Sequence, residues 1–430
     1  MCRSPAISIE PVRIVTALSF QTLANILSQA GTFTSLLIVA RLLGHLQYGK
    51  FAFVQSTVIT FNTVAGLGLG ITATKYVSEY RLLDPGKASR VLGLTSIVAM
   101  ASAALFGLVY LVACRSLIGE GYVGAMQIGS FAIVFSTLNG YQLGAMAGFE
   151  AFDKIARANA IVAIANPIGA ALLTRIFGFS GALAALSLNG FSIWAIYHFT
   201  LRAQCRTWNC PVRYRGFWEE RSVLFAMSAP ACVSGIIGSI AIWGTMLMLS
   251  RVANGYAHIA LFSAANSLRL MVTFFPNVLN AVMMPMLNSL LATGDRKRFE
   301  RTFALNVVVS GCVACAGALV FLFFRTRLLG LFGRDFIDRD GVVPVLLLAT
   351  VIEVAACSVY PAIFVYGRMW RQVVTIALWA ATLLGTMRFG AVQGARGLAT
   401  AYVGAWTVSL ILYSYHAWSL NQRAQEEPIT

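Results

Sequence analysis

Twelve long apolar runs, separated by short polar segments, dominate the pattern of the sequence. Each run is long enough to cross the hydrocarbon core of a bilayer, which takes about 20 helical residues. Backbone groups in lipid must be hydrogen-bonded within the protein, so these runs predict transmembrane helices and an all-α membrane protein. The twelve predicted spans lie near residues 14–40, 51–74, 91–114, 122–147, 158–176, 179–200, 223–249, 258–291, 303–324, 342–365, 372–388 and 395–418.

Positive charges in the polar segments predict the orientation of the chain. With both termini in the cytoplasm, 20 of the 32 Lys and Arg residues fall in inner segments and 11 in outer segments, while Arg269 lies within a span. An excess of Lys and Arg is typical of cytoplasmic loops, so this bias favours cytoplasmic termini. The outer loop from Arg325 to Arg339 is an exception that its acidic residues partly offset.

The composition agrees with a membrane protein and argues against several other classes of protein. Of the 430 residues, 58% are hydrophobic and 11% are charged, which leaves too little polar surface for a soluble globule. The net charge of +16 does not indicate a nucleic-acid-binding domain, because the cations lie singly between apolar runs. The eight scattered cysteines predict neither a disulfide framework nor a metal site, and the absence of a phosphate-binding loop motif argues against ATP hydrolysis. We therefore expect no cofactor.

The two halves of the chain share a faint repeat. Ala40-Arg41 corresponds to Ser250-Arg251, and residues 51–56 (FAFVQS) correspond to residues 262–267 (FSAANS), at an offset of 210 to 211 residues. Transporters are commonly built from such repeats, and the six spans between equivalent points imply halves of parallel topology. We predict an N-terminal six-helix lobe at 1–200, a cytoplasmic linker at 201–221 and a C-terminal six-helix lobe at 222–430.

The stretch from residue 40 to residue 76 resembles a known family. It contains Ala40-Arg41-Leu42-Leu43-Gly44, Tyr48-Gly49 and Phe51-Ala52, followed by Gly66-Leu67-Gly68-Leu69-Gly70 and Lys75-Tyr76. This pattern resembles the opening of the bacterial polysaccharide transporters. These are the O-antigen (oligosaccharide) flippases of the multidrug/oligosaccharidyl-lipid/polysaccharide exporter superfamily, which also contains the MATE multidrug exporters. The resemblance implies a MATE-like fold of twelve transmembrane helices, in two six-helix lobes of parallel topology around a central cavity.

The resemblance also implies a function. The implied function is that of a flippase of the bacterial inner membrane that works by alternating access. Such a flippase translocates a polyprenyl-diphosphate-linked oligosaccharide for the synthesis of O-antigen, exopolysaccharide or capsule. The expected partners are this lipid-linked oligosaccharide, membrane lipids, a proton or sodium ion, and a polysaccharide polymerase with its glycosyltransferases. An alternative is a MATE-like ion-coupled exporter of organic cations. An enzyme is not expected, because the longest outer loop has only about 17 residues.

Arg269 is the first candidate binding residue. It lies about 11 residues into the eighth span, which places it roughly 17 Å deep at 1.5 Å per residue. In one interpretation it lines the cavity and binds the diphosphate through its forked donors. In another it forms a structural pair with Glu353, which is about as deep in the tenth span. Glu353 has a further role open to it, because a buried carboxylate can carry the proton of a coupled exchange.

Lys75 and Arg81 are candidates at the cytoplasmic end of the second span. The resemblance implies a cationic entrance there, which would capture the anionic head group of the substrate. The alternative is that the lysine extends along the helix to place its charge at the membrane surface.

Glycines recur at every fourth position in two spans. Gly66 and Gly70 do so in the second span, and Gly140, Gly144 and Gly148 in the fourth. This spacing lets helix backbones approach closely, so it predicts a helix crossing.

Overall fold

The computed structural model describes residues 11–117, 123–220, 228–292, 295–365 and 369–426. Within these ranges the chain is almost entirely helical and has no strand. Arg3, Arg221 and Arg368, which the sequence assigns to the inner side, lie outside the described residues. The helices are α1 (Pro11–Leu43), α2 (His45–Gly66), α3 (Leu69–Leu83), α4 (Pro85–Leu117), α5 (Val123–Gly148), α6 (Phe152–Thr207), η2 (Phe217–Glu220), α8 (Ser228–Ser250), α9 (Gly255–Ala292), α10 (Arg296–Phe323), α11 (Arg325–Gly330), α12 (Val342–Val365), α13 (Met369–Gly390), η3 (Ala391–Gln393) and α14 (Ala395–Glu426).

The described helices account for the twelve predicted crossings. Ten of them are long and apolar enough to cross a membrane, and the bent pair α2–α3 provides one more. α6 has 56 residues and contains both the fifth and the sixth predicted spans. These two spans are separated at Gly178, where φ is +56° and the backbone is not helical.

The second predicted span is divided rather than continuous. α2 ends at Gly66, and α3 starts at Leu69 after a bend of 41°. Leu67 and Gly68 both have positive φ, at 45° and 66°, a conformation that interrupts a right-handed helix. Gly68 adopts it without steric cost, whereas Leu67 is strained. The break therefore falls within the glycine-rich segment.

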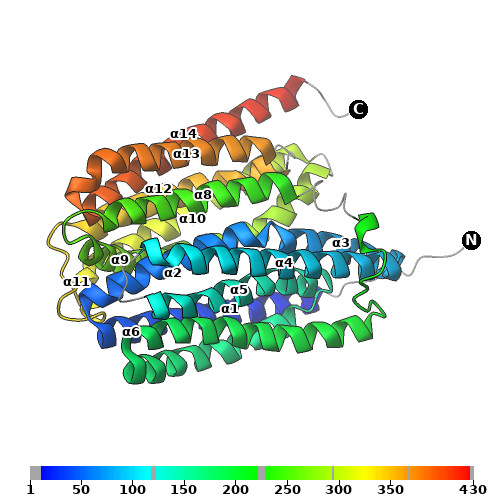
Figure 1. Ribbon diagram of the computed structural model, residues 1–430. Coiled ribbons are helices and arrows are strands. Elements are labelled where there is room, and N and C mark those ends of the chain that lie inside the picture. Colours follow the sequence, from blue (N-terminus) through cyan, green and yellow to red (C-terminus); the bar gives the residue numbers. More distant parts are fainter. Residues whose placement is uncertain (1–10, 118–122, 221–227, 293–294, 366–368, 427–430) are drawn as a thin grey trace, which may run out of the picture.

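The helices form two packed groups that lie side by side (Figure 1). α1 to α6 pack mainly on one another and form the N-terminal lobe, and α8 to α14 do the same and form the C-terminal lobe. α11 lies at one end of the bundle and η2 at the other, and we call these the α11 end and the linker end. Both predicted lobes are thus present. The exact domain boundaries stay a prediction, and α6 continues as a helix to Thr207, into the segment predicted as linker.

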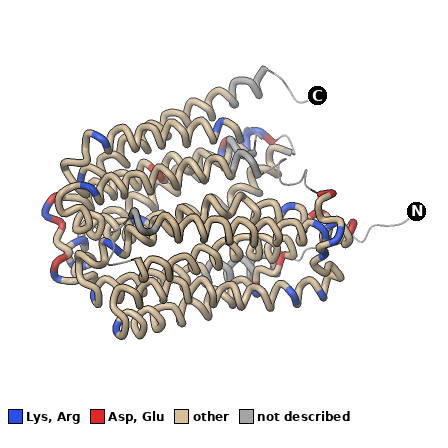
Figure 2. The backbone as a smooth tube through the Cα atoms, in the orientation of Figure 1, with Lys and Arg blue, Asp and Glu red and all other residues tan. Residues whose placement is uncertain are grey.

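Charged and apolar residues are distributed as a bilayer requires. Lys, Arg, Asp and Glu gather at the two ends of the bundle, and its middle carries few of them (Figure 2). Large apolar side chains are exposed along the outer faces of the helices, for example Ile168 and Leu172 on α6 and Leu319 on α10. Such faces are stable in lipid and not in water, so the chain is a multi-pass membrane protein.

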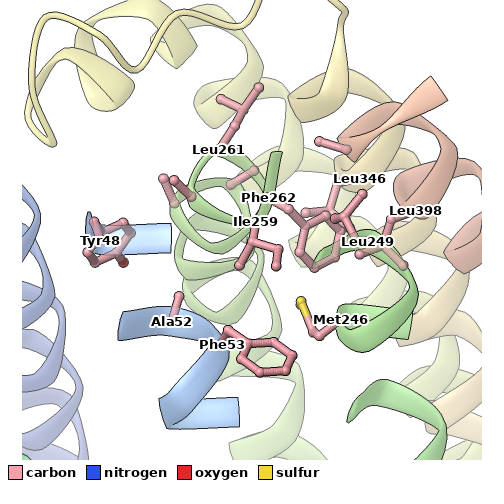
Figure 3. Packing of buried hydrophobic residues seen from close by; sticks show 14 of the residues in the cluster. Tyr48, Ala52, Phe53, Met246, Leu249, Ile259, Leu261, Phe262, Leu346 and Leu398 are labelled. Carbon is pink, nitrogen blue, oxygen red and sulfur yellow. The ribbon is translucent and has the colours of Figure 1, made fainter. Parts of the chain in front are cut away.

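α2 and α9, the helices that begin at equivalent positions of the repeat, pack against each other between the lobes. Tyr48 and Phe53 of α2 belong to the same apolar cluster as Ile259 and Phe262 of α9 (Figure 3). The backbones approach so closely that a Cβ atom at Gly49 would lie 1.8 Å from the carbonyl oxygen of Tyr256. The repeat predicted from the sequence therefore places its two equivalent helices at the lobe interface.

The predicted glycine crossing joins α3 to α5. A Cβ atom at Gly144 would lie 2.1 Å from the carbonyl oxygen of Gly70, and one at Gly148 would lie 2.7 Å from Cβ of Val77. Because the two helices lie so close, the hydroxyl of Thr74 can donate a hydrogen bond of 3.0 Å to the carbonyl of Gly144. The prediction of a close helix approach is confirmed.

Candidate functional site

Arg269 and Glu353 meet inside the C-terminal lobe. Arg269 lies 14 residues after the start of α9, which is about 21 Å along the helix axis. Nη1 of Arg269 donates a hydrogen bond to Oε2 of Glu353 on α12, and the two groups form a salt bridge. Their side chains keep only 13% and 15% of their surface exposed. Of the two interpretations of Arg269, the pairing with Glu353 is the contact that the structure contains.

Two further side chains complete the surroundings of the Arg269 guanidinium. Its Nε donates a hydrogen bond of 2.7 Å to Oδ1 of Asn266, one turn earlier on α9. Its Cζ lies 5.9 Å from the ring centroid of Tyr402 on α14, so the aromatic face adds a cation–π contact. The pair thus lies where α9, α12 and α14 pack together. A carboxylate, an amide and an aromatic face together hold the cation.

Other polar groups are buried elsewhere in the C-terminal lobe. Asn306 of α10 is fully buried and donates hydrogen bonds to Oδ1 of Asn280 at 2.9 Å and to the carbonyl of Ser358 at 3.4 Å. The indole nitrogens of Trp379 and Trp406 are buried and have no hydrogen-bond partner among the residues that the structure describes. Each buried polar group without a hydrogen-bond partner costs free energy, whereas the amide nitrogen of Asn306 is paired.

Sequence reasoning missed Asn266, Asn306 and Tyr402. The signal that could have found the two asparagines is a carboxamide inside an otherwise apolar span. Tyr402 gives no such signal, because tyrosine is common in spans and its contact depends on how α14 is rotated against α9.

Arg81 lies in the N-terminal lobe and is held by its neighbours. It is 8% exposed, pairs with Glu150 at 2.5 Å and donates a hydrogen bond of 3.0 Å to the carbonyl of Gly148. Its guanidinium also lies 4.8 Å from the ring centroid of Trp208. Arg81 thus fastens the end of α3 to the turn between α5 and α6 and to the end of α6.

Lys75 is less constrained. It is half-buried on α3, its ammonium lies 5.2 Å from the ring centroid of Tyr76, and it makes no ion pair within the described residues. The four predicted site residues therefore form two separate groups. Arg269 and Glu353 lie together in one lobe, and Lys75 and Arg81 lie in the other.

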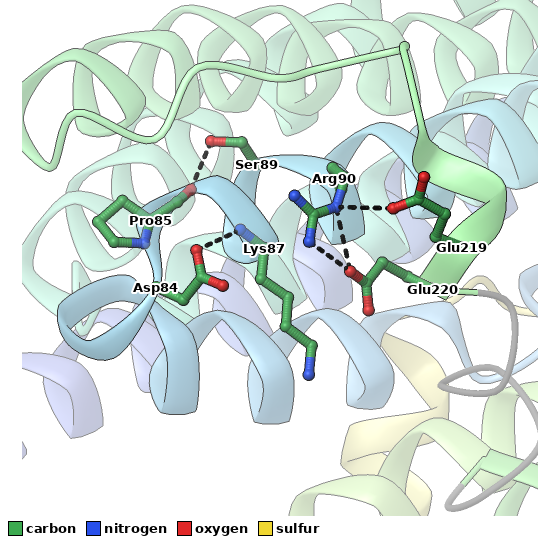
Figure 4. A network of polar contacts seen from close by, with 7 residues as sticks. All are labelled: Asp84, Pro85, Lys87, Ser89, Arg90, Glu219 and Glu220. Carbon is green, nitrogen blue, oxygen red and sulfur yellow. Dashed lines mark hydrogen bonds and ion pairs between the residues drawn. The ribbon is translucent and has the colours of Figure 1, made fainter.

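The linker is fastened to the N-terminal lobe by charge (Figure 4). Arg90 of α4 donates two hydrogen bonds to Oε1 of Glu220, at 3.1 and 2.9 Å, and Glu219 lies 4.0 Å away. The linker also buries Cys210, and this burial raises the pKa of its thiol. Within the described residues no cluster of three or more His, Cys, Asp or Glu side chains could hold a metal ion.

Contacts between the lobes extend to the α11 end. Nε of Arg41, at the end of α1, donates a hydrogen bond of 2.6 Å to the carbonyl of Leu331. Phe332 and Phe336, which follow α11, lie 6.3 and 5.7 Å from the ring centroid of Tyr48 on α2. His45 makes an edge contact with Phe336 at 4.8 Å. This aromatic cluster joins the lobes at the α11 end.

Comparison with known proteins places the chain in a family. The family described as polysaccharide biosynthesis protein matches residues 15–291, which is most of the chain. No curated protein matches the sequence significantly.

Solved transporter structures share the fold. An inward-facing multidrug resistance MATE family transporter of the MOP superfamily has a TM-score of 0.77 at 13% identity, covering 92% of this chain and 96% of its own. An outward-facing MATE structure has a TM-score of 0.72 at 14% identity, covering 96% of both chains. A MOP superfamily transporter from Pyrococcus furiosus, described as having a binding pocket of reversed polarity, has a TM-score of 0.71 at 13% identity and covers 96% of both chains. The chain therefore has the MATE-type transporter fold and belongs to the polysaccharide biosynthesis protein family.

Proposed function

We propose that the protein is a flippase for surface polysaccharide biosynthesis. It moves a polyprenyl-diphosphate-linked oligosaccharide from the cytoplasmic to the outer leaflet of the bacterial inner membrane, with both termini in the cytoplasm. The observation that carries this proposal is a transporter fold in a chain that belongs to the polysaccharide biosynthesis family. The excess of cations agrees with a substrate that carries a diphosphate.

The two-lobed fold supports alternating access. The lobes meet through α2, which packs against α8 and α9, and through the aromatic cluster at the α11 end. Trp243 of α8 donates a hydrogen bond of 3.1 Å to the hydroxyl of Thr57 on α2 at this interface. Rocking of the lobes about α2 would open the central cavity first to one side and then to the other.

The Arg269–Glu353 pair is the proposed coupling and binding site. The carboxylate of Glu353 accepts a hydrogen bond from the guanidinium of Arg269, and this pairing leaves fewer donors of Arg269 for a second anion. A diphosphate that enters the site competes with this carboxylate for the forked donors of Arg269. Glu353, displaced from the guanidinium, is the proposed carrier of the proton in a coupled exchange. Sodium is the alternative coupling ion.

Lys75 is the proposed entrance cation at the linker end. Its ammonium has no acidic partner within the described residues, so it can attract the diphosphate before the substrate enters. Arg81 lies on the same helix, where Glu150 compensates its charge. A direct contact of Arg81 with the substrate would require it to leave Glu150.

Transport by the purified protein tests the proposal. Proteoliposomes contain a fluorescent polyprenyl-diphosphate oligosaccharide in both leaflets, and a membrane-impermeant quencher is added outside. The quencher reaches only outer-leaflet lipid, so quenching beyond that fraction reports flipping of lipid from the inner leaflet. A parallel set of vesicles measures uptake of an organic cation dye. We expect protein-dependent flipping without dye transport. Dye transport without flipping would reject the flippase and favour the exporter.

A further inference from the structure

A cavity of about 690 Å³ lies in the N-terminal lobe, away from the Arg269–Glu353 pair. Its walls come from α4, α5, the last turns of α6 and the linker between Asn209 and Tyr214. The volume is typical of sites that hold small molecules or head groups, which are about 300–1,000 Å³. None of the residues assigned a role in transport lines it.

Two cations line this cavity. Arg202 and Arg206 lie one turn apart on α6 and are both exposed. Neither forms an ion pair within the described residues, and the cavity lining includes no Asp or Glu. Like charges at this spacing repel each other on a helix surface. An anion bound between the two guanidinium groups would relieve the repulsion and use the donors of both.

Neutral donors complete the lining. Tyr141 of α5 and Tyr214 of the linker each present a phenol, and Asn209 presents an amide. Guanidinium forks bind phosphate oxygens in pairs, and hydroxyl and amide donors suit the oxygens that remain. This set of donors matches a tetrahedral phosphate better than a flat carboxylate.

The linker wall of the cavity is held in place. The backbone nitrogen of Arg213 donates a hydrogen bond of 3.1 Å to the carbonyl of Ser89 on α4. A Cβ atom at Gly93 would lie 1.9 Å from the carbonyl oxygen of Arg213, so the linker lies directly on the helix backbone. The ion pair between Arg90 and Glu220 fixes the end of the same segment. A ligand would find this wall already formed, which lowers the entropic cost of binding.

The neighbouring face of α6 points to a lipid as the source of the phosphate. Phe191, Trp194 and His198 form a ladder of ring contacts, with centroids 5.8 and 5.2 Å apart, and Phe199 extends it. Phe199 is 69% exposed and Phe191 is 43% exposed. Aromatic side chains on an outer face are typical of the boundary between bilayer and water. Acyl chains could therefore run along this face while a head group enters the cavity.

We propose that the cavity is a binding site for an anionic phospholipid, whose head-group phosphate is held by Arg202 and Arg206. The site goes beyond the proposed transport function and does not depend on it. Binding there would tie the linker, α4 and α6 to the lipid at the surface of the membrane.

Native mass spectrometry of the purified full chain tests the proposal. The protein is titrated with phosphatidylglycerol, with phosphatidylcholine and with inorganic phosphate. The test variant is Arg202→Gln with Arg206→Gln. The control is Arg296→Gln with Arg298→Gln, which removes two exposed charges at the start of α10. Size-exclusion profiles verify that both variants stay folded.

We expect the wild type to prefer phosphatidylglycerol over phosphatidylcholine and over inorganic phosphate. The Arg202/Arg206 variant should bind phosphatidylglycerol at least roughly tenfold more weakly, while the control pair binds as the wild type does. Equal binding by the test variant, or an equal loss in the control, would overturn the site. Inorganic phosphate binding more tightly than phosphatidylglycerol, with the same dependence on arginine, would overturn the lipid as the ligand.

Discussion

Arg269 and Glu353 are opposite charges held within one lobe of a membrane protein. Their positions within apolar spans could be predicted from the sequence, because the run lengths place Arg269 in the eighth span and Glu353 in the tenth. Their contact with Asn266 and Tyr402 could not, because it depends on the relative rotation of α9, α12 and α14. Position along the span alone left two interpretations of Arg269 open. Only the packing of the helices shows that the guanidinium of Arg269 pairs with the carboxylate of Glu353.

Removing one charge of this pair should destabilise the lobe. Glu353→Ala or Arg269→Ala leaves its partner buried without a counter-charge, which typically costs about 3–5 kcal/mol. The double variant Arg269→Met with Glu353→Leu removes both charges at similar volume and should recover most of the loss. Unfolding in detergent, followed by tryptophan fluorescence, measures these free energies.

The matched control for the pair is Arg298→Ala. The Arg298 side chain is 79% exposed at the start of α10, so its loss should change the free energy of unfolding by less than about 1 kcal/mol. If the Arg269 and Glu353 single variants were as stable as this control, the pair would have no structural role.

The crossing of α3 and α5 shows what spacing can predict about an element. The repeat of glycine at every fourth position predicted a close approach of helices. It could not say which glycine makes the contact, because that depends on the facing helix. Gly144 lies against the backbone of Gly70, whereas a Cβ atom at Gly140 would meet nothing within 4 Å. The break between α2 and α3 shows the same limit, since the glycine-rich segment did not reveal that Leu67 would adopt positive φ.

Gly144→Ala should therefore destabilise the N-terminal lobe. The new Cβ atom would lie 2.1 Å from a backbone oxygen, so α3 and α5 must separate. Overpacking of this kind costs about 1–3 kcal/mol. Gly140→Ala is the matched control, and it should be neutral or stabilising by up to about 1 kcal/mol because alanine favours the helix. Thermal unfolding of the two variants side by side measures the difference, and equal melting temperatures would argue against the crossing.

The whole molecule is a pair of lobes whose equivalent helices α2 and α9 face each other. The faint repeat in the sequence was sufficient to predict two halves of parallel topology, because a small number of matched residues fixes the offset. The contacts that join the lobes at the α11 end could not be predicted. Arg41 and Leu331 are 290 residues apart, and nothing local in either segment indicates its partner.

A cross-link at this contact should stop transport. Nε of Arg41 lies 2.6 Å from the carbonyl of Leu331, and Arg41→Cys with Leu331→Cys puts one thiol on each lobe beside this contact. A reducible bifunctional thiol reagent that spans the length of the lost arginine side chain can then join the lobes. If the lobes must part here for the outer side to open, the cross-link should abolish flipping in proteoliposomes, and a reductant should restore it. Each single cysteine variant treated with the same reagent serves as the control, and full flipping by the cross-linked double variant would show that this contact persists through the transport cycle.

Flipping by Arg269 variants is the most direct test of the proposed mechanism. Wild type, Arg269→Lys, Arg269→Ala and Arg298→Ala are compared at equal amounts of folded protein in proteoliposomes that contain a fluorescent polyprenyl-diphosphate oligosaccharide. We predict that the alanine variant loses flipping and that lysine, which keeps the charge but not the fork, retains part of it. The Arg298 control should flip at the rate of the wild type. Normal flipping by Arg269→Ala would contradict a role of this guanidinium in binding the diphosphate.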